Sequence, residues 1–246
     1  MYYPHYKKNN KNVPILKRDE IDVIAEKYAE EFMPQIITNP QAFDIDGFAE
    51  RYLNLIIDFQ NLSHNGTYLG MTVFNNTNKV IIYDPYNNCA DYFHADQGTV
   101  IIDNSLLRDN QEHRYRFTLG HECGHWIFHK DYFGYNPNQL SLFEADKPYQ
   151  MCREVNQNDS RNFTETWDEA RWLEWHADKF SAGILMPKTS ICNLLKNSSE
   201  MGLYEKVALL SEVFNVSQEA AYYRLCALKY VNYSVESSEY QQLTLL

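Results

Sequence analysis

The chain has 246 residues, of which 44% are hydrophobic, and its 33 acidic and 22 basic side chains give a formal net charge of −11. This size suits one sizeable domain, and the acidic balance disfavours a nucleic-acid-binding surface. No run approaches the roughly 18 apolar residues of a membrane span, and residues 1–20 lack the apolar stretch of a signal peptide. The five cysteines are scattered without a C-x-x-C pair, which favours reduced thiols in a cytoplasm.

The expected class is α+β and mostly helical, in one domain with a short extension at each end. The predicted segments are a flexible arm over residues 1–14, a single domain over residues 15–232 and a tail over residues 233–246. An amphipathic helix is predicted over residues 19–32, and it ends before Pro34. A second helix is predicted over residues 44–59, where large apolar side chains recur at helical spacing.

Three short segments rich in β-branched residues follow and are separated by Asn, Gly and Pro. They cover residues 70–74, 79–83 and 99–103, and they are predicted to be strands. The run Asn75-Asn76-Thr77-Asn78 is typical of a hairpin loop between the first two strands. We therefore expect a small three-stranded sheet before the next helix. The sequence does not identify which strand is its exposed edge.

The run His121-Glu122-Cys123-Gly124-His125 reads H-E-x-x-H and lies in a predicted helix over about residues 110–129. Residues four apart share one face of a helix, so His121 and His125 can bind one metal ion together. In zinc proteases the intervening glutamate is the general base for the attacking water. The run therefore predicts a zinc site in which Glu122 is catalytic.

Two unrelated histidines on a surface helix are the alternative, so the flanking residues must decide. Apolar and small side chains recur at helical spacing on both sides of the motif: Phe117, Gly120, Gly124, Ile127 and Phe128. Asp109 and Glu112, three residues apart, are typical of a helix start. This pattern favours a buried helix, in which paired histidines need a partner.

A catalytic zinc site takes three protein ligands, and a second predicted helix over about residues 167–185 can supply the third. Thr166 and Glu169 form a capping-box pair at its start, and Pro187 ends it. Three small residues on one side of this helix would let another helix approach closely: Ala177, Ser181 and Ala182.

Glu174 and Asp178 are four residues apart on this second helix and share a face. Glu174 is the predicted third ligand. Asp178 is predicted to accept the spare N–H of a metal-bound imidazole, which fixes the tautomer of that ring. An ordinary acidic pair on a surface helix is the alternative, and the H-E-x-x-H run on the other helix favours the metal interpretation.

Two further histidines lie near these residues in the sequence. His129 shares the motif face but lies about 6 Å further along the axis, so it is interpreted as a residue behind the ligands or at the helix C-terminus. His176 points off the Glu174 face and could line the cleft as an oxyanion stabiliser. Tyr149 and Arg171 are further oxyanion candidates without any support from spacing. The remaining histidines are interpreted as surface or structural: His5, His64, His94 and His113.

Two helices are predicted near the end of the chain, over about residues 203–214 and 218–230, and they meet at Asn215-Val216-Ser217. This pattern is similar to a helix-turn-helix. The segment carries three basic and three acidic side chains, so it lacks the basic face that phosphate contact requires. A structural pair packed on the metal-binding helices is the preferred interpretation, and DNA contact is the alternative.

Three runs in the right order resemble the ImmA/IrrE family of metallo-endopeptidases. Residues 116–125 read R-F-T-L-G-H-E-C-G-H and resemble the family motif R-F-T-x-x-H-E-x-G-H. Residues 174–181, followed by Leu185-Met186-Pro187, are similar to its E-x-x-A-[ND]-x-F-A…L-M-P segment. Residues 207–228, with F-N-V-S at 214–217 and R-L at 224–225, resemble its closing F-x-V-S…R-L helices. The resemblance covers about residues 45–230.

This resemblance implies a gluzincin-like, zincin-type fold with one zinc ion on His121, His125 and Glu174, and with Glu122 as the base. It also implies a cytoplasmic endopeptidase that cleaves a separately encoded helix-turn-helix repressor in mobile-element or stress-response regulation. Nickel or manganese could occupy the same ligands. Two features depart from the family: His176 replaces a different polar residue, and the insert of about 40 residues between the two metal-binding helices is long.

A non-catalytic regulatory protein is the rival interpretation. Such a protein would sequester a repressor or contact DNA, and its metal would serve structure only. Glu122 beside a complete ligand set argues against it, because a structural site needs no base. The acidic balance and the lack of a long apolar run predict no direct nucleic-acid or membrane binding.

Overall fold

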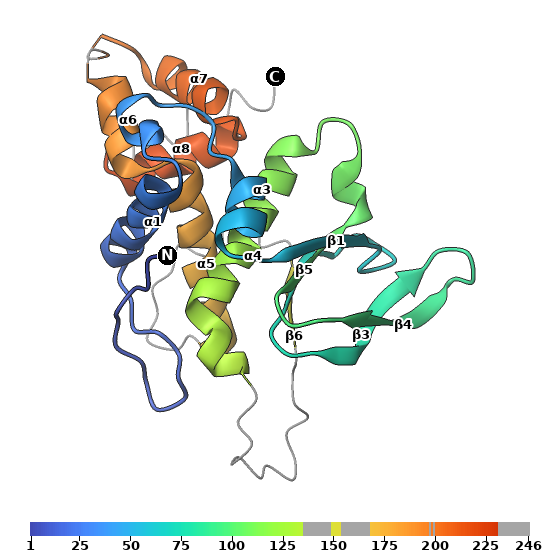
Figure 1. Cartoon of the computed structure of the whole chain (residues 1–246). Helices are drawn as coiled ribbons and strands as arrows, with labels where there is room; N and C mark the ends of the chain where they lie inside the picture. The colour runs from blue at the N-terminus through green and yellow to red at the C-terminus, as the bar shows by residue number, and fades with distance from the viewer. Residues whose placement is uncertain (135–148, 154–167, 197, 199, 231–246) are drawn as a thin grey trace.

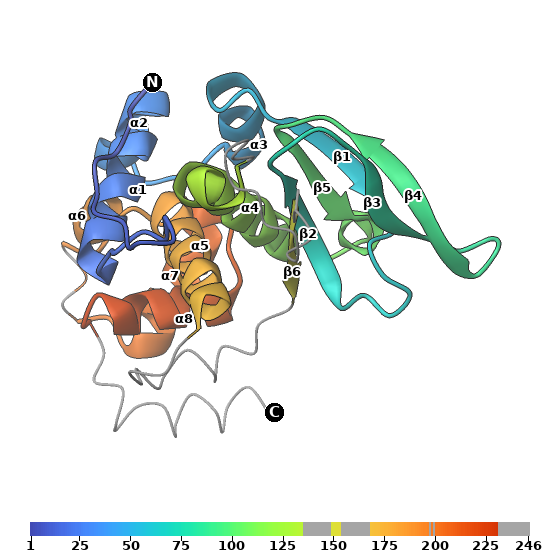
Figure 2. The same cartoon turned by 90° about the horizontal axis from the view of Figure 1, so that it is seen from below.

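The computed structural model describes residues 1–134, 149–153, 168–196, 198 and 200–230, and it confirms the α+β class. Helix α4 lies between a group of helices on one side and two β-sheets on the other (Figures 1 and 2). The helices are α1 (Arg18–Phe32), α2 (Gln35–Thr38), α3 (Ile45–Gly47), α4 (Glu112–Phe133), α5 (Glu169–Leu185), α6 (Lys188–Leu195), α7 (Leu203–Phe214) and α8 (Gln218–Ala227). None of the helices in these residues combines the length and apolarity that crossing a membrane requires.

The sheet next to α4 has four strands in the order β1-β5-β2-β6. The strands of the structure are β1 (Ile56–Gln60), β2 (Tyr68–Val73), β3 (Thr77–Asp84), β4 (Cys89–Ala95), β5 (Thr99–Asp103) and β6 (Tyr149–Arg153). Strand β5 is buried at every position and pairs parallel with β1 and antiparallel with β2. Strand β6 pairs antiparallel with β2, with Met151 opposite Met71. In this four-stranded sheet β1, β2 and β5 precede α4, whereas β6 comes from the insert that follows it.

The predicted pairing between residues 70–74 and 79–83 is wrong. Strand β3 instead pairs with β4 in a separate two-stranded sheet, which the sequence analysis did not predict. The turn between them is fixed by Asp84, whose side chain accepts from the backbone N–H of Tyr86 at 2.8 Å, and by Asn88, whose φ is 52°. Asn88 tolerates this left-handed conformation better than most residues, so a turn signal was present in the sequence.

The predicted helix over residues 44–59 is wrong in its second half. The chain is helical through α3 and a π-helical turn over Phe48–Tyr52, and it then leaves the helix at Asn54, whose φ is 54°. Strand β1 begins at Ile56, whose N–H donates to the carbonyl of Gly98 at 2.9 Å. The apolar spacing fits a helix locally, but pairing with β5 outweighs that local preference.

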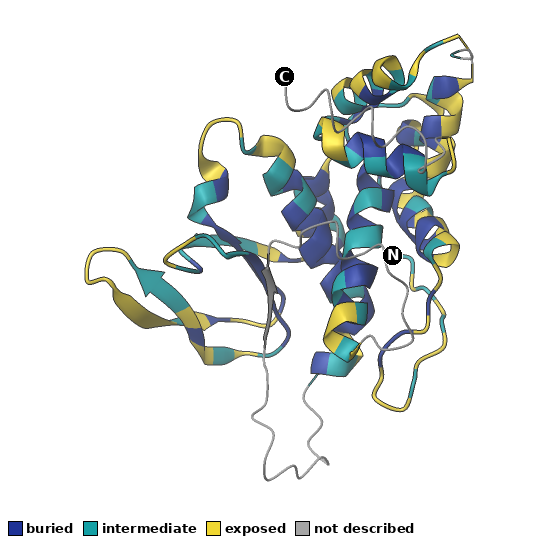
Figure 3. Cartoon of the chain, turned by 180° about the vertical axis from the view of Figure 1, so that it is seen from behind, coloured by how far each residue is buried: buried dark blue, intermediate teal, exposed yellow. Residues whose placement is uncertain are grey.

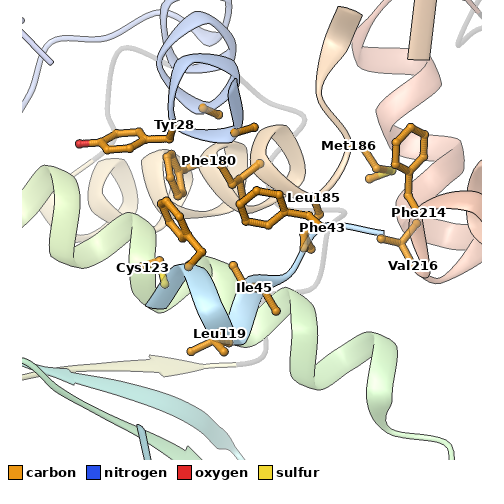
Figure 4. Packing of buried hydrophobic residues seen from close by; sticks show 14 of the residues in the cluster. Tyr28, Phe43, Ile45, Leu119, Cys123, Phe180, Leu185, Met186, Phe214 and Val216 are labelled. Carbon is orange, nitrogen blue, oxygen red and sulfur yellow. The ribbon is translucent and has the colours of Figure 1, made fainter. Parts of the chain in front are cut away.

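Helix α1 matches the predicted helix over residues 19–32 closely and buries one face against α5. Its contact with α5 is close, because a Cβ atom on Gly183 would lie 2.9 Å from the Cβ of Ala25. Tyr28 of α1 and Phe180 of α5 pack edge to face with ring centroids 5.9 Å apart (Figure 4). Cys123 of α4 lies in the same core, and the four cysteines with described side chains are free thiols.

Helices α4 and α5 approach each other closely through small residues, as the sequence predicts. A Cβ atom on Gly124 would lie 3.0 Å from the Cα of Ala177, and one on Gly120 would lie 2.6 Å from the Oγ of Ser181. The Ser181 hydroxyl donates to the carbonyl of Phe117 at 2.8 Å, so the contact also satisfies a buried polar group. Both helices are mostly buried (Figure 3).

The starts of α4 and α5 differ from the predicted capping pairs. The N-cap of α4 is Gln111, two residues after the predicted Asp109. The N-cap of α5 is Asp168, whose side chain accepts from the N–H of Arg171 at 2.9 Å, and Thr166 lies outside the described residues. An aspartate N-cap serves the same purpose as the predicted threonine, because either side chain satisfies a free backbone N–H.

The residues predicted as a flexible arm make defined contacts with the rest of the chain. The Tyr6 hydroxyl donates to the carbonyl of Ile127 at 3.4 Å, and the side chain of Val13 is buried beside Phe74 and Phe133. The arm therefore packs against the C-terminal end of α4. The predicted tail over residues 233–246 lies outside the described residues.

Helices α7 and α8 form the predicted closing pair, although α8 ends at Ala227 and not at residue 230. Asn215 lies between them with a φ of 52°, and the Ser217 side chain caps α8. Arg224 of α8 is buried, donating to Asp22 of α1 at 2.6 Å and to the carbonyl of Met186 at 3.0 Å. This ion pair ties the end of the chain to its first helix.

We predict that Arg224→Met destabilises the protein by about 3–5 kcal/mol, because the substitution leaves the Asp22 carboxylate buried without its partner. Urea unfolding measures this change. Arg51→Met is the matched control, because Arg51 and its partner Asp44 have 68% and 47% of their side chains exposed. The control should cost less than about 1 kcal/mol. Equal unfolding midpoints for the two variants would show that the buried ion pair contributes no more to stability than the exposed one.

Candidate metal centre

The close contact between α4 and α5 brings together the three predicted metal ligands. His121 and His125 lie on the face of α4 that meets α5, and their Nε2 atoms are 2.9 Å apart. From α5, the Glu174 carboxylate places Oε2 3.3 Å from the Nε2 of His121 and Oε1 3.5 Å from the Nε2 of His125. One ligand atom from each residue thus lies within 4.8 Å of the others.

These donor atoms fit a single metal ion. Ligands about 2.0–2.1 Å from a tetrahedral ion lie roughly 3.3 Å from one another, and the observed separations bracket that distance. Both imidazoles turn Nε2 toward the carboxylate and use Nδ1 for other partners. The group formed by His121, His125 and Glu174 could therefore hold a metal ion.

Asp178 orients the first of the two imidazoles. Its Oδ1 lies 2.8 Å from the Nδ1 of His121, and the helical spacing from Glu174 places both carboxylates beside the same ring. Burial alone would lower the pKa of His121, but hydrogen bonds to Asp178 and Glu174 outweigh burial and raise this pKa well above its usual value. The geometry is the one that fixes a ligand imidazole with Nε2 directed toward a metal.

The Glu174 side chain carries a negative charge in this arrangement. Burial alone would raise its pKa, but the charge of His125 and hydrogen bonds from both imidazoles lower the pKa of Glu174 well below its usual range. The side chain of Glu174 is also 19% exposed, whereas that of His125 is fully buried. Of the three side chains, that of Glu174 is therefore the most exposed.

His125 is oriented by a histidine and not by a carboxylate. Its Nδ1 lies 2.8 Å from the Nδ1 of His129, and the Nε2 of His129 lies 3.4 Å from the Nδ1 of His176. Burial and neighbouring imidazoles lower the pKa of His129 well below its usual value and the pKa of His176 to about 4. His129 thus lies behind the ligands, as one of the two predicted interpretations has it.

Glu122 faces the sheet and is fully buried. Its Oε2 accepts a hydrogen bond from the Thr72 hydroxyl at 2.6 Å, and its Oε1 has no hydrogen-bond partner among the described residues. A Cβ atom on Gly70 would lie 2.4 Å from that Oε1, so only glycine leaves room for the carboxylate. Neither residue of β2 was predicted from the sequence, although a glycine inside a strand is a known sign of close approach.

Of the three oxyanion candidates, only His176 and Arg171 have side chains that the structure describes. His176 is fully buried behind His129, where it has no open face toward a substrate. Arg171 is exposed in the first turn of α5. The backbone of Tyr149 pairs with Val73 at the start of β6, and its side chain lies outside what the structure describes. The oxyanion role predicted for His176 is therefore not supported by its position.

Arg116 anchors the start of α4 to two other parts of the chain. Its Nη2 donates to the carbonyl of Phe43 at 2.9 Å, and its Nε donates to the carbonyl of Asn215 at 3.0 Å. Asn215 also donates from its side chain to Glu112 at 2.5 Å. The turn between α7 and α8 thus holds the N-terminal end of the helix that carries the ligands.

A scan of the sequence against protein-family models gave no match, and a search of curated proteins gave none either. The assignments at this centre therefore depend on the residues themselves and on the geometry that the fold gives them.

We predict that Thr72→Val lowers the free energy of unfolding by about 1–3 kcal/mol, because the buried Glu122 carboxylate loses its donor. Thr72→Ser keeps the hydroxyl and should recover most of this loss. Thermal and urea unfolding of both variants measures the difference. A valine variant as stable as the serine variant would mean that the hydrogen bond to Glu122 contributes nothing.

Proposed function

We propose that the protein is a zinc-dependent endopeptidase of the ImmA/IrrE type. The observation that carries the proposal is the buried Glu122, which follows the ligand His121 directly and has one carboxylate oxygen without a partner among the described residues. Among the described residues, three side chains could hold the ion, which would leave a fourth position for water, as in catalytic zinc sites. Two imidazoles and one carboxylate suit zinc, and the same donors leave nickel or manganese as alternatives.

A zinc ion held by these residues would supply an activated water nucleophile and polarise the scissile carbonyl. The chain's own groups supply the proton transfers. Glu122 accepts the proton of the attacking water on Oε1, which has no hydrogen-bond partner among the described residues, and later delivers it to the leaving amine nitrogen. Thr72 holds the other oxygen of the carboxylate, so Glu122 keeps one orientation during both transfers. Asp178 and His129 keep the two imidazoles in place.

The arrangement of α4 on a mixed sheet supports a zincin-like fold. Strand β2 contacts Glu122, and β6 lies on the outer side of β2 at one end of the described sheet. An extended peptide can add to such an edge through backbone hydrogen bonds. We therefore assign the substrate to the β6 edge, since the other edge strand, β1, is separated from β2 by β5.

The proposed substrate is a helix-turn-helix repressor encoded as a separate chain, and the proposed compartment is the cytoplasm. Both follow from the resemblance of three runs to the ImmA/IrrE family. Helices α7 and α8 of the chain itself have a structural role, because Arg224 is buried against Asp22 and Asn215 anchors α4. This burial removes one of the three basic side chains of the pair from any phosphate contact, which disfavours DNA binding.

We predict that Asp178→Ala lowers the affinity for zinc about 10–100-fold, because His121 loses the acceptor that orients it. Glu174→Ala, which removes a ligand, should weaken binding further. Competition with a chromophoric chelator measures both dissociation constants. Asp131→Ala is the control, since Asp131 is an exposed residue paired with Lys8 at the surface. Equal affinities for the Asp178 and Asp131 variants would remove Asp178 from the metal centre.

We predict that Glu122→Gln lowers peptide cleavage by about 100-fold or more while zinc stays bound, because the amide cannot accept the proton of water. Zinc-loaded protein is incubated with a panel of small helix-turn-helix repressors and with a peptide library, and fragments are identified by mass spectrometry. Glu169→Gln, which alters a carboxylate paired with Lys11, is the matched control. Wild-type cleavage by the Glu122 variant would overturn the mechanism. A stable complex with a repressor and no cleavage by the wild type would support the non-catalytic rival.

A further inference from the structure

Three buried imidazoles form a continuous chain behind the metal centre, and we name His125, His129 and His176 the histidine chain. The two contacts along it are 2.8 Å, from Nδ1 to Nδ1, and 3.4 Å, from Nε2 to Nδ1. All three side chains are fully buried, and large aromatic residues surround the far end, with Trp172, Trp175 and Phe128 within ring contact of His176. Buried imidazoles in such surroundings are costly unless they are paired.

The hydrogen bonds of the histidine chain have one direction, which follows from matching each donor with an acceptor. A metal on Nε2 of His125 leaves the ring proton on Nδ1, which must then be donated to the Nδ1 of His129. His129 accepts there and so carries its own proton on Nε2, which points at the Nδ1 of His176. His176 in turn must carry its proton on Nε2, an atom without a partner among the described residues.

We infer that His129 and His176 are positioning residues for the ligand His125, and that metal binding fixes one tautomer along the whole histidine chain. The inference rests on the proposed metal centre. Without a metal, both directions of donation satisfy the two contacts. With a metal, only the direction that starts at the Nδ1–H of His125 remains. His129 thus provides for His125 what Asp178 provides for His121, but it does so without a charge.

The two contacts differ in expected strength. The distance of 2.8 Å between His125 and His129 is that of a good hydrogen bond, whereas 3.4 Å between His129 and His176 is long. Substitutions at His129 should therefore affect the metal more than substitutions at His176.

Zinc affinity of the full chain, measured by chelator competition, tests this inference. His129→Phe should weaken zinc binding about 10–100-fold, because the Nδ1–H of His125 loses its acceptor. His129→Asn should recover part of the loss, since its amide oxygen takes the place of Nδ1. His176→Phe should have a smaller effect, and His64→Phe, at an exposed position outside the chain, should have none. Folded His129→Phe protein with wild-type affinity overturns the inference.

Nitrogen-15 NMR of histidine-labelled wild-type protein gives a test that needs no variant. In the zinc-loaded protein, the expected protonated atoms are Nδ1 of His125, Nε2 of His129 and Nε2 of His176. A proton on Nδ1 of His129 in that state overturns the inference. A wild type that binds no zinc would overturn the metal centre and the inference together. Zinc binding with the expected tautomers but no peptide cleavage would overturn only the endopeptidase function.

Discussion

The close approach of α4 and α5 is the constraint on which the rest of the structure depends. A side chain larger than hydrogen at Gly124 would meet the backbone of Ala177, and one at Gly120 would meet Ser181. Each of the two helices supplies only part of the donor set, so their separation decides whether His121, His125 and Glu174 converge. Packing of the core therefore brings the three donor side chains together.

The local part of this centre could be predicted from the sequence. The spacing of His121 with His125, and of Glu174 with Asp178, is fixed by the helix itself, and the small residues between the two helices were visible as a pattern. Contacts between distant segments could not be read in this way. Thr72 and Gly70 reach Glu122 from a strand about 50 residues earlier, and no spacing rule connects them.

The wrong predictions of the fold have the same origin, which is contact between distant segments. Residues 53–59 carry apolar side chains at a spacing that suits a helix, but β1 is decided by its pairing with β5 more than 40 residues later. Strand β3 was expected beside its sequence neighbour β2, whereas its partner is β4 across a turn at Asn88. Strand β6 lies in a polar insert, and only its pairing with β2 identifies it. A strand pairs with a distant segment that the local sequence does not identify. Helices were therefore predicted better than strands.

The donor set and Glu122 are held by different layers of the molecule. Contacts between α4 and α5 set the distances among His121, His125 and Glu174, whereas a hydrogen bond from β2 sets the orientation of Glu122. A small shear of the sheet along α4 would lengthen the bond from Thr72 while leaving the donor distances unchanged. If the proposed metal binds, its donors and the orientation of Glu122 would therefore depend on different contacts, so one could change without the other.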